Sequence, residues 1–128
     1  MRILVTGGRK FSDRELLFAT LDRLHAEKHI ALVIHGDAQG TDRLAGDWAQ
    51  SRGIPVLARP ADWKRYGRAV GPVPNRQMLA DNPNLVVAFP GGAGTQNMIE
   101  IARKLGIPVI LTDSHSAQRD TGEPSPGT

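Results

Sequence analysis

The sequence states one pattern twice, as His35-Gly36-Asp37-Ala38-Gln39-Gly40-Thr41 and as Phe89-Pro90-Gly91-Gly92-Ala93-Gly94-Thr95. Each string follows a short apolar run, ends in Gly-Thr, and leads into a stretch that closes on Gly-Ile-Pro-Val, at residues 53–56 and 106–109. A strand, a glycine turn, a helix and a second strand would give this order. We expect Thr41 and Thr95 to be helix N-caps, and the later glycines to follow the helix ends.

Apolar runs on either side extend this unit into an alternating pattern of strands and helices. We predict strands at residues 2–6, 31–35, 55–59, 85–89 and 108–112, because these runs are short, β-branched and almost continuously apolar. Ser12-Asp13-Arg14-Glu15 is a capping-box signature, and the leucines that follow predict a helix to about Lys28. Further helices are expected from Thr41 to Gly53, over residues 75–81, and from Thr95 to Gly106. The predicted fold is an α/β domain with a mostly parallel sheet of about five strands flanked by helices.

Length and composition limit what the chain can be. Its 128 residues, 14 glycines and absence of cysteine fit one domain without disulfides or thiolate metal ligands. The start reads as a strand and not as a signal peptide, and no apolar run approaches the length of a membrane helix, so we expect a cytoplasmic protein without membrane contact. We predict one domain over residues 1–112 and a disordered polar tail over 113–128.

Three glycine-rich turns follow predicted strands and are expected at one sheet edge. They are Thr6-Gly7-Gly8-Arg9, residues 36–41 and residues 91–95. Glycine lets a ligand approach the backbone, and the N–H groups at a helix start favour phosphate. Tight turns alone could also explain the glycines. The ligand-binding candidates in these turns are Gly7, Gly8, Arg9, His35, Gly36, Asp42, Gly91, Gly92, Gly94 and Thr95.

A basic segment over residues 59–76 adds further candidates. It contains five basic residues against one acidic residue, within a protein whose formal charge is +3. Trp63 and Tyr66 lie among these charges, a combination suited to stacking on a base while binding its phosphates. Trp63 could equally fill the core of the domain. Trp63, Asn75 and Arg76 are the ligand-binding candidates of this segment.

Familiar catalytic signatures are missing. The third glycine of a dinucleotide fingerprint is absent after Gly94, and there is no P-loop, no nucleophile elbow, and no His/Asp/Glu spacing typical of a metal site. Asp42 is the weak candidate for an acid–base group, although a carboxylate in the first turn of a helix is stabilised there without catalysis. The catalytic residues are therefore not assigned, and no cofactor is expected to be required.

The ordered motifs together resemble the YspA/YpsA-related family of the SLOG superfamily. The resemblance rests on the three glycine turns, on Ala61-Asp62-Trp63, Tyr66-Gly67, Gly71-Pro72 and Asn75, and on the helices between them, over residues 1 to about 112. It implies a Rossmann-like domain that binds a nucleotide or nucleotide derivative, such as AMP or ADP-ribose. It also implies a homodimer or higher homo-oligomer.

Two branches of the superfamily supply different functions. Pro90 to Thr95 is similar to the motif of the Lonely-guy phosphoribohydrolases, whose glutamate would fall at Met98 and whose arginine would fall at Pro74. Both changes disfavour that hydrolysis, since a thioether cannot stabilise an oxocarbenium ion. Residues 35–42 are similar to a turn of the DprA-like mediators, which bind single-stranded DNA. Nucleotide binding is our first expectation, with enzymatic processing as an N-glycosidic or phosphoryl hydrolase left open, and single-stranded nucleic acid is the alternative partner.

Overall fold

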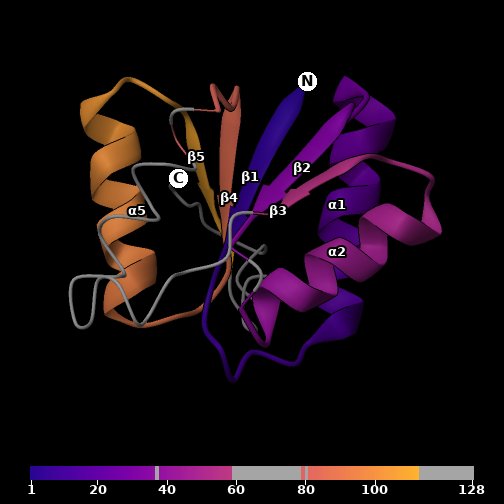
Figure 1. The fold of residues 1–128 in the computed structure, drawn as a ribbon, viewed down its shortest axis with the longest axis horizontal. Coiled ribbons are helices and arrows are strands. Elements are labelled where there is room, and N and C mark those ends of the chain that lie inside the picture. Colours follow the sequence, from indigo (N-terminus) through magenta and orange to yellow (C-terminus); the bar gives the residue numbers. More distant parts are fainter. Residues whose placement is uncertain (37, 59–78, 80, 113–128) are drawn as a thin grey trace, which may run out of the picture.

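The computed structural model describes residues 1–36, 38–58, 79 and 81–112 of the chain (Figure 1). These residues form a five-stranded sheet in the order β3-β2-β1-β4-β5, and every neighbouring pair is parallel. The strands are β1 (Arg2–Thr6), β2 (Leu32–His35), β3 (Val56–Ala58), β4 (Leu85–Ala88) and β5 (Val109–Leu111). The predicted α/β fold is confirmed, as a Rossmann-like arrangement in which each predicted strand is present. Strands β2, β4 and β5 are one or two residues shorter than predicted, and β3 begins one residue later.

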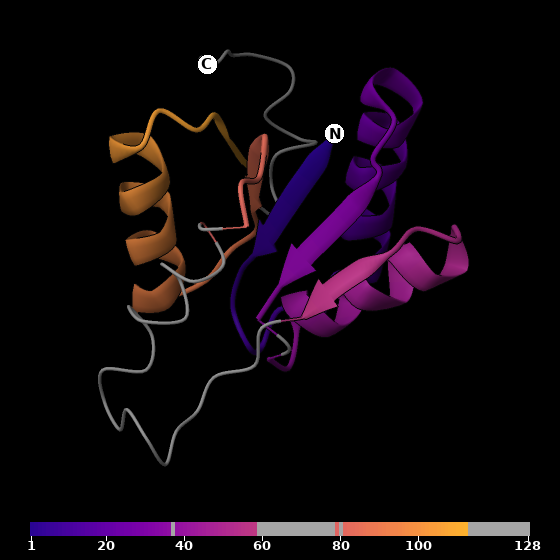
Figure 2. The same cartoon turned by 45° about the horizontal axis from the view of Figure 1, so that its top comes forward.

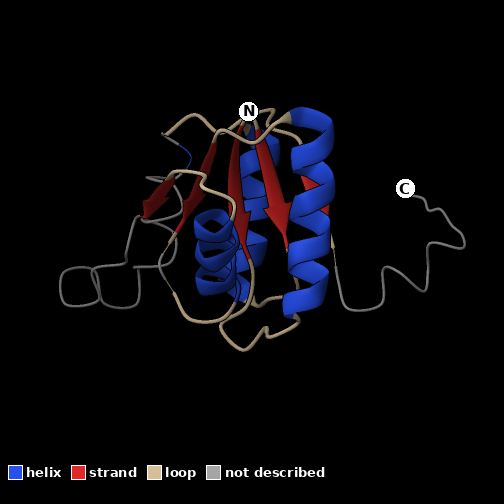
Figure 3. Cartoon of the chain, turned by 90° about the vertical axis from the view of Figure 1, so that its right-hand side faces the viewer, coloured by secondary structure: helices blue, strands red, loops and turns tan. Residues whose placement is uncertain are grey.

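The helices of the described residues cover both faces of the sheet. They are α1 (Arg14–Lys28), α2 (Thr41–Ser51) and α5 (Ala93–Lys104). Helices α1 and α2 lie on one face and α5 lies on the other (Figures 1 and 2). Figure 3, viewed from the side of α1 and α2, shows both in front of the strands. Each face of the sheet therefore packs against its helices to form a separate hydrophobic core.

Alternate residues of β1 divide between these two cores. Ile3 and Val5 are buried with Trp48 and the leucines of α1, while Leu4 is buried with Met98 and Ala102 of α5. This period of two is what a strand covered on both faces requires. Because β1 is the central strand, its carboxyl end is fixed from both sides before the chain enters its glycine turn.

Helix α1 begins one residue later than the capping box predicted. Asp13, and not Ser12, is the N-cap, and its carboxylate accepts a hydrogen bond from the Leu16 N–H at 3.0 Å. Asp and Ser are similarly good N-caps, so the sequence alone does not choose between neighbours. The predicted apolar stripe is confirmed, because Leu17, Leu21 and Leu24 are buried.

The two Gly-Ile-Pro-Val strings end α2 and α5 in the same way. The Gly53 N–H bonds to Gln50 O, and the Ile54 N–H to Ala49 O. Corresponding bonds follow α5, from Gly106 and Ile107. Both glycines have positive φ, 69° and 77°, as the Schellman motif requires. The sequence repeat therefore correctly predicted a repeated helix end.

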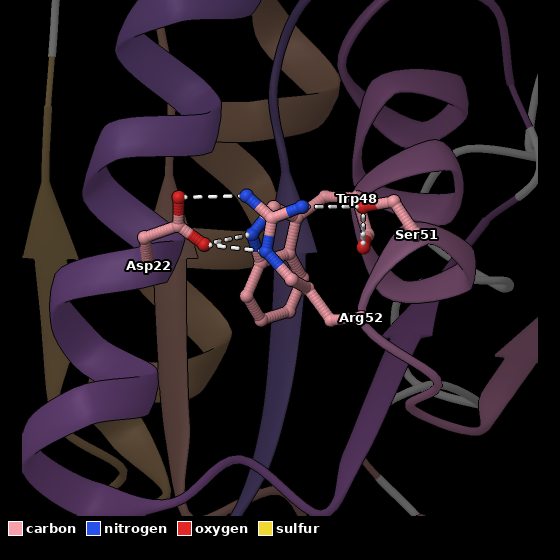
Figure 4. Close-up of polar contacts among 4 residues, drawn as sticks. All are labelled: Asp22, Trp48, Ser51 and Arg52. Carbon is pink, nitrogen blue, oxygen red and sulfur yellow. Dashed lines mark hydrogen bonds and ion pairs between the residues drawn. The ribbon is translucent and has the colours of Figure 1, made fainter.

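A polar cluster joins α1 to the carboxyl-terminal half of α2 (Figure 4). Asp22 accepts hydrogen bonds from the indole N–H of Trp48 and from Nε and Nη2 of Arg52, each at 2.8 Å. These bonds, from Arg52 first and Trp48 second, hold the pKa of the Asp22 carboxyl below its usual range. The indole ring itself is fully buried, so the cluster satisfies its only donor.

The remaining predictions about chain organisation fall mostly outside the described residues. Of the helix expected over residues 75–81, Leu79 is helical and buried on the side of α5, while residues 75–78 and 80 are not described. The tail over residues 113–128 is also outside the description. Within residues 1–36, 38–58, 79 and 81–112, no helix is long and apolar enough to cross a membrane.

Candidate functional site

The turns after β1, β2 and β4 meet at the carboxyl edge of the sheet, where the strand arrows point in Figure 1. Strands β1 and β4 are neighbours, but the helices that follow them leave to opposite faces. Ligands of open parallel sheets bind at such a reversal of strand order, beyond the carboxyl ends. The candidate site is therefore the junction of the β1 and β4 turns.

Backbone hydrogen bonds join the three turns directly. The Gly8 N–H donates to Pro90 O at 2.8 Å, which ties the β1 turn to the β4 turn. From the other side, the N–H and hydroxyl of Thr41 both donate to Gly8 O, at 3.2 and 3.0 Å. Gly8 thus lies between the two Gly-Thr turns, and the sequence prediction that these turns come together is correct.

Four of the glycines are needed for this contact between turns. A methyl group on Gly7 would overlap the Thr41 side chain, and one on Gly8 would lie 2.9 Å from Pro90 O. A methyl group on Gly91 would lie 2.7 Å from the Gly8 nitrogen, and one on Gly40 would overlap the carbonyls of Gly8 and Arg9. Real Cβ atoms do not approach this closely. These glycines therefore make room for neighbouring turns.

The prediction that threonines cap the two helices is wrong. Gly40 is the N-cap of α2 and Gly92 is the N-cap of α5, so both helices begin earlier relative to their threonines than expected. Thr41 is the first helical residue, and its hydroxyl is bonded to Gly8 O instead. Thr95 is the third helical residue and is buried against Gly91. Packing on a neighbouring turn replaces the local cap at Thr41, and contact with Gly91 of its own turn replaces it at Thr95.

Asp42 has a defined structural role. Its Oδ2 accepts hydrogen bonds from the N–H groups of Gly36 at 3.0 Å and Ala38 at 3.2 Å, and the residue is buried. The carboxylate therefore folds the β2 turn back onto the start of α2. Charge-assisted bonds of this kind, together with the helix dipole, account for an aspartate at this position.

The amino end of α5 is different because its glycines face open space. A methyl group on Gly92 or Gly94 would meet no heavy atom within 4 Å, and both residues are exposed. The first turn of α5 contains no acidic residue, whereas that of α2 contains Asp42. Among the described residues, the turn before α5 therefore has exposed glycines and no acidic residue in the first helical turn, unlike the turn before α2.

His35 ends β2 as predicted, and its imidazole packs beside Gly46 of α2. It is 4% exposed and lies under α2, where its Nε2 would be 3.2 Å from a methyl group on Gly46. Arg9 follows Gly8 in the β1 turn and is exposed. Trp63, Asn75 and Arg76 lie outside the described residues.

The sequence analysis missed two features of the site. Gly40 was not among the candidates, yet its φ of +75° and its contact with the β1 turn place it at the centre of the turn packing. The start of α5 at Ala93 was also missed, because this helix was expected to begin at Thr95. The glycines before each threonine were the available signal, since glycine is itself an accepted N-cap.

Comparison with known proteins agrees with this architecture. The sequence model of the YspA, cpYpsA-related SLOG family matches residues 1–66. The chain belongs to this SLOG family. It is also similar to the Gene 61 protein of Mycobacterium phage D29, with 37% identity over 118 residues that span 85% of this chain and 94% of that protein. The SLOG match covers the β1 and β2 turns, while the β4 turn lies beyond residue 66.

Proposed function

We propose that this SLOG protein binds a nucleotide or nucleotide derivative of the AMP or ADP-ribose type, with a phosphate at the amino end of α5. Membership of the SLOG family supports a nucleotide-related role. The strand order supports the place, because β1 and β4 form the reversal point of the sheet.

The observation behind this choice of turn is the open surface at Gly92 and Gly94. A phosphate needs close approach to backbone N–H groups at a helix start and suffers from a neighbouring carboxylate. The β2 turn offers neither condition, because Gly40 is packed and Asp42 occupies the first turn of α2. In the β4 turn, Gly92 and Gly94 are exposed, and the first turn of α5 contains no acidic residue.

The proposal is binding, without an assigned reaction. Met98, where the Lonely-guy motif would have its glutamate, is fully buried beside Leu4 and Ile34. Glu100, the next acidic residue of α5, is exposed on a different part of the helix. Neither residue supports hydrolysis by that mechanism, and Asp42 is engaged with the backbone of its own turn.

Calorimetric titration of the purified protein with AMP and with ADP-ribose tests the proposal. We expect saturable binding that Gly94→Val weakens at least tenfold, because a branched side chain would cover the N–H groups of the turn. Ala19→Val is the matched control, since it adds the same branching to an exposed helical position of α1. Equal affinity of Gly94→Val and the control would contradict the proposed site.

A short single-stranded oligonucleotide in the same titration distinguishes the alternative function. Binding of the strand with no binding of either nucleotide, lost steeply as salt rises, would overturn the proposal in favour of a nucleic-acid-binding module. Release of free base from AMP would instead show that the protein has the hydrolase activity that the burial of Met98 disfavours.

A further inference from the structure

A hollow of about 440 Å³ lies between α2 and the edge strand β3, beside the end of β2. Its walls include Arg43, Asp47 and Gln50 from α2, Ile54 and Val56 from the segment that follows, and His35 from β2. Its volume is within the range of small-molecule pockets. Nothing in the proposed nucleotide site requires such a hollow.

Gly46 lines the hollow at its contact with His35. It lies on α2, and the imidazole of His35 occupies the space beside it. Glycine inside a helix costs about 1 kcal/mol relative to alanine. A methyl group would be 3.2 Å from His35 Nε2, which is tight, so the buried imidazole and the glycine fit one another.

The polar groups around the hollow come from one face of α2. Arg43, Asp47 and Gln50 are spaced by one and two helical turns, so a cation, an anion and an amide follow one another along one wall. Asp47 Oδ2 is 3.4 Å from Nη1 of Arg14, but both side chains are 55% exposed, so this ion pair is weak. The opposite charges of Arg43 and Asp47 make the wall neutral overall.

The other wall is aliphatic. Ile54 is buried and Val56 is 40% exposed at the edge of the sheet. A matching ligand therefore has an anionic group for the guanidinium, a cationic group for the carboxylate one turn further on, and an aliphatic part that covers Ile54 and Val56. Such a ligand carries one positive and one negative charge and is neutral overall, like the pair of Arg43 and Asp47 that it would contact.

We propose that this hollow binds a free aliphatic amino acid as its zwitterion. The Arg43 guanidinium binds the α-carboxylate, the Asp47 carboxylate accepts from the α-ammonium, and the side chain packs on Ile54 and Val56. Gln50 offers a donor and an acceptor beside them. This second site is separate from the phosphate position at α5.

Titration of the ¹⁵N-labelled protein with L-leucine tests the proposal by NMR. We expect saturable shifts of the Gly46 and Gln50 amides. The analogues 4-methylpentanoate, which lacks the ammonium group, and 3-methylbutylamine, which lacks the carboxylate, should bind at least tenfold more weakly. Equal binding of either analogue would overturn the zwitterion proposal, and no shifts with 20 mM leucine would overturn the site itself.

Variants locate the binding on this hollow. Arg43→Gln should raise the leucine Kd at least tenfold, while Arg23→Gln, on the exposed face of α1, should leave it unchanged. Gly46→Leu should fill the hollow and abolish the shifts, and Arg43→Gln provides the test if that variant does not fold. Gly94→Val should bind leucine normally, which separates this site from the proposed nucleotide site. Equal weakening by Arg43→Gln and Arg23→Gln would contradict the assignment.

Discussion

The two Gly-Thr turns are alike in sequence and different in structure. In the β2 turn, Gly40 packs on the carbonyls of Gly8 and Arg9, and Asp42 binds the N–H groups of Gly36 and Ala38. In the β4 turn, Gly92 and Gly94 face open space. One turn is filled by the protein's own atoms, whereas a side chain at Gly92 or Gly94 of the other turn would meet none of them.

This difference shows that a glycine-rich turn at a strand end has two separate uses. Glycine can admit a neighbouring turn, as Gly7, Gly8, Gly40 and Gly91 do, or it can leave room for a ligand, as we propose for Gly92 and Gly94. The first use affects the free energy of unfolding, and the second affects binding. Substitutions in the two turns should therefore have different readouts.

The largest expected effect is on the stability of the packed turn. Gly40→Ala places a Cβ at a φ of +75° and against two backbone carbonyls, which cannot move independently of the β1 turn. We expect a loss of about 3 kcal/mol in the free energy of unfolding. Urea denaturation measures this loss.

Gly94→Ala is the matched variant in the open turn. It replaces glycine with alanine at a helical position where the new methyl group meets nothing, so we expect unchanged or slightly increased stability. If both alanine variants were equally stable, the division of the glycines into packed and open would be wrong.

The second prediction concerns the residue after each threonine. Asp42→Ala removes the acceptor of two backbone N–H groups, and we expect a loss of about 2 kcal/mol in the free energy of unfolding. Faster amide exchange at Gly36 and Ala38 should accompany it. Gln96, the corresponding residue of α5, is exposed, so Gln96→Ala should change stability by less than about 0.5 kcal/mol. Unchanged exchange at Gly36 would refute the role of Asp42.

Gln96→Asp would make the open turn resemble the packed one. A carboxylate in the first turn of α5 is favourable for the helix but repels a bound phosphate, so stability should hold while nucleotide binding weakens by about 1 kcal/mol, roughly fivefold in Kd. Calorimetric titration with AMP at low salt measures the change. Gln96→Asn is the uncharged control, and equal loss in both variants would argue against an electrostatic origin.

Much of the fold could be predicted because its signals are local. The apolar runs located the five strands of the described residues, and the Gly-Ile-Pro-Val strings located the ends of α2 and α5. The starts of these helices could not be predicted in the same way. Whether Thr41 caps its helix depends on Gly8, which is 33 residues away in the chain and adjacent only in the folded sheet.

The same reason limits prediction of the candidate site. Counting glycines identified the three turns but not their division into packed and open, since that depends on which turn lies against which. His35 was predicted from its position at a strand end, which alone does not tell that the alternation of β2 directs its side chain under α2. Strand ends locate a site, and side-chain direction decides which residues enter it.

The smallest expected effect lies away from both turns, at Asp22, and it tests whether stability and binding are separable. Its pKa is lowered in the folded protein by the bonds from Arg52 and Trp48, so its contribution is complete at neutral pH and is lost as the pH falls below about 4. Asp22→Asn keeps an oxygen acceptor but removes this charge. Because the Asp22 side chain is 45% exposed, we expect a loss below about 1 kcal/mol at pH 7.

Urea midpoints of the wild type and Asp22→Asn should therefore differ at pH 7, and the difference should shrink as the pH falls below about 4, since every other titrating group is common to both proteins. A difference in urea midpoint that stays constant with pH would show that Asp22→Asn is destabilising because asparagine is a poorer acceptor, and not because a charge is missing. The affinity for AMP at pH 7 should be the same in both proteins, because Asp22 joins α1 to the far half of α2 and contacts none of the glycine turns. A change in the affinity for AMP would show that the contact between α1 and α2 influences the β4 turn through the β2 turn.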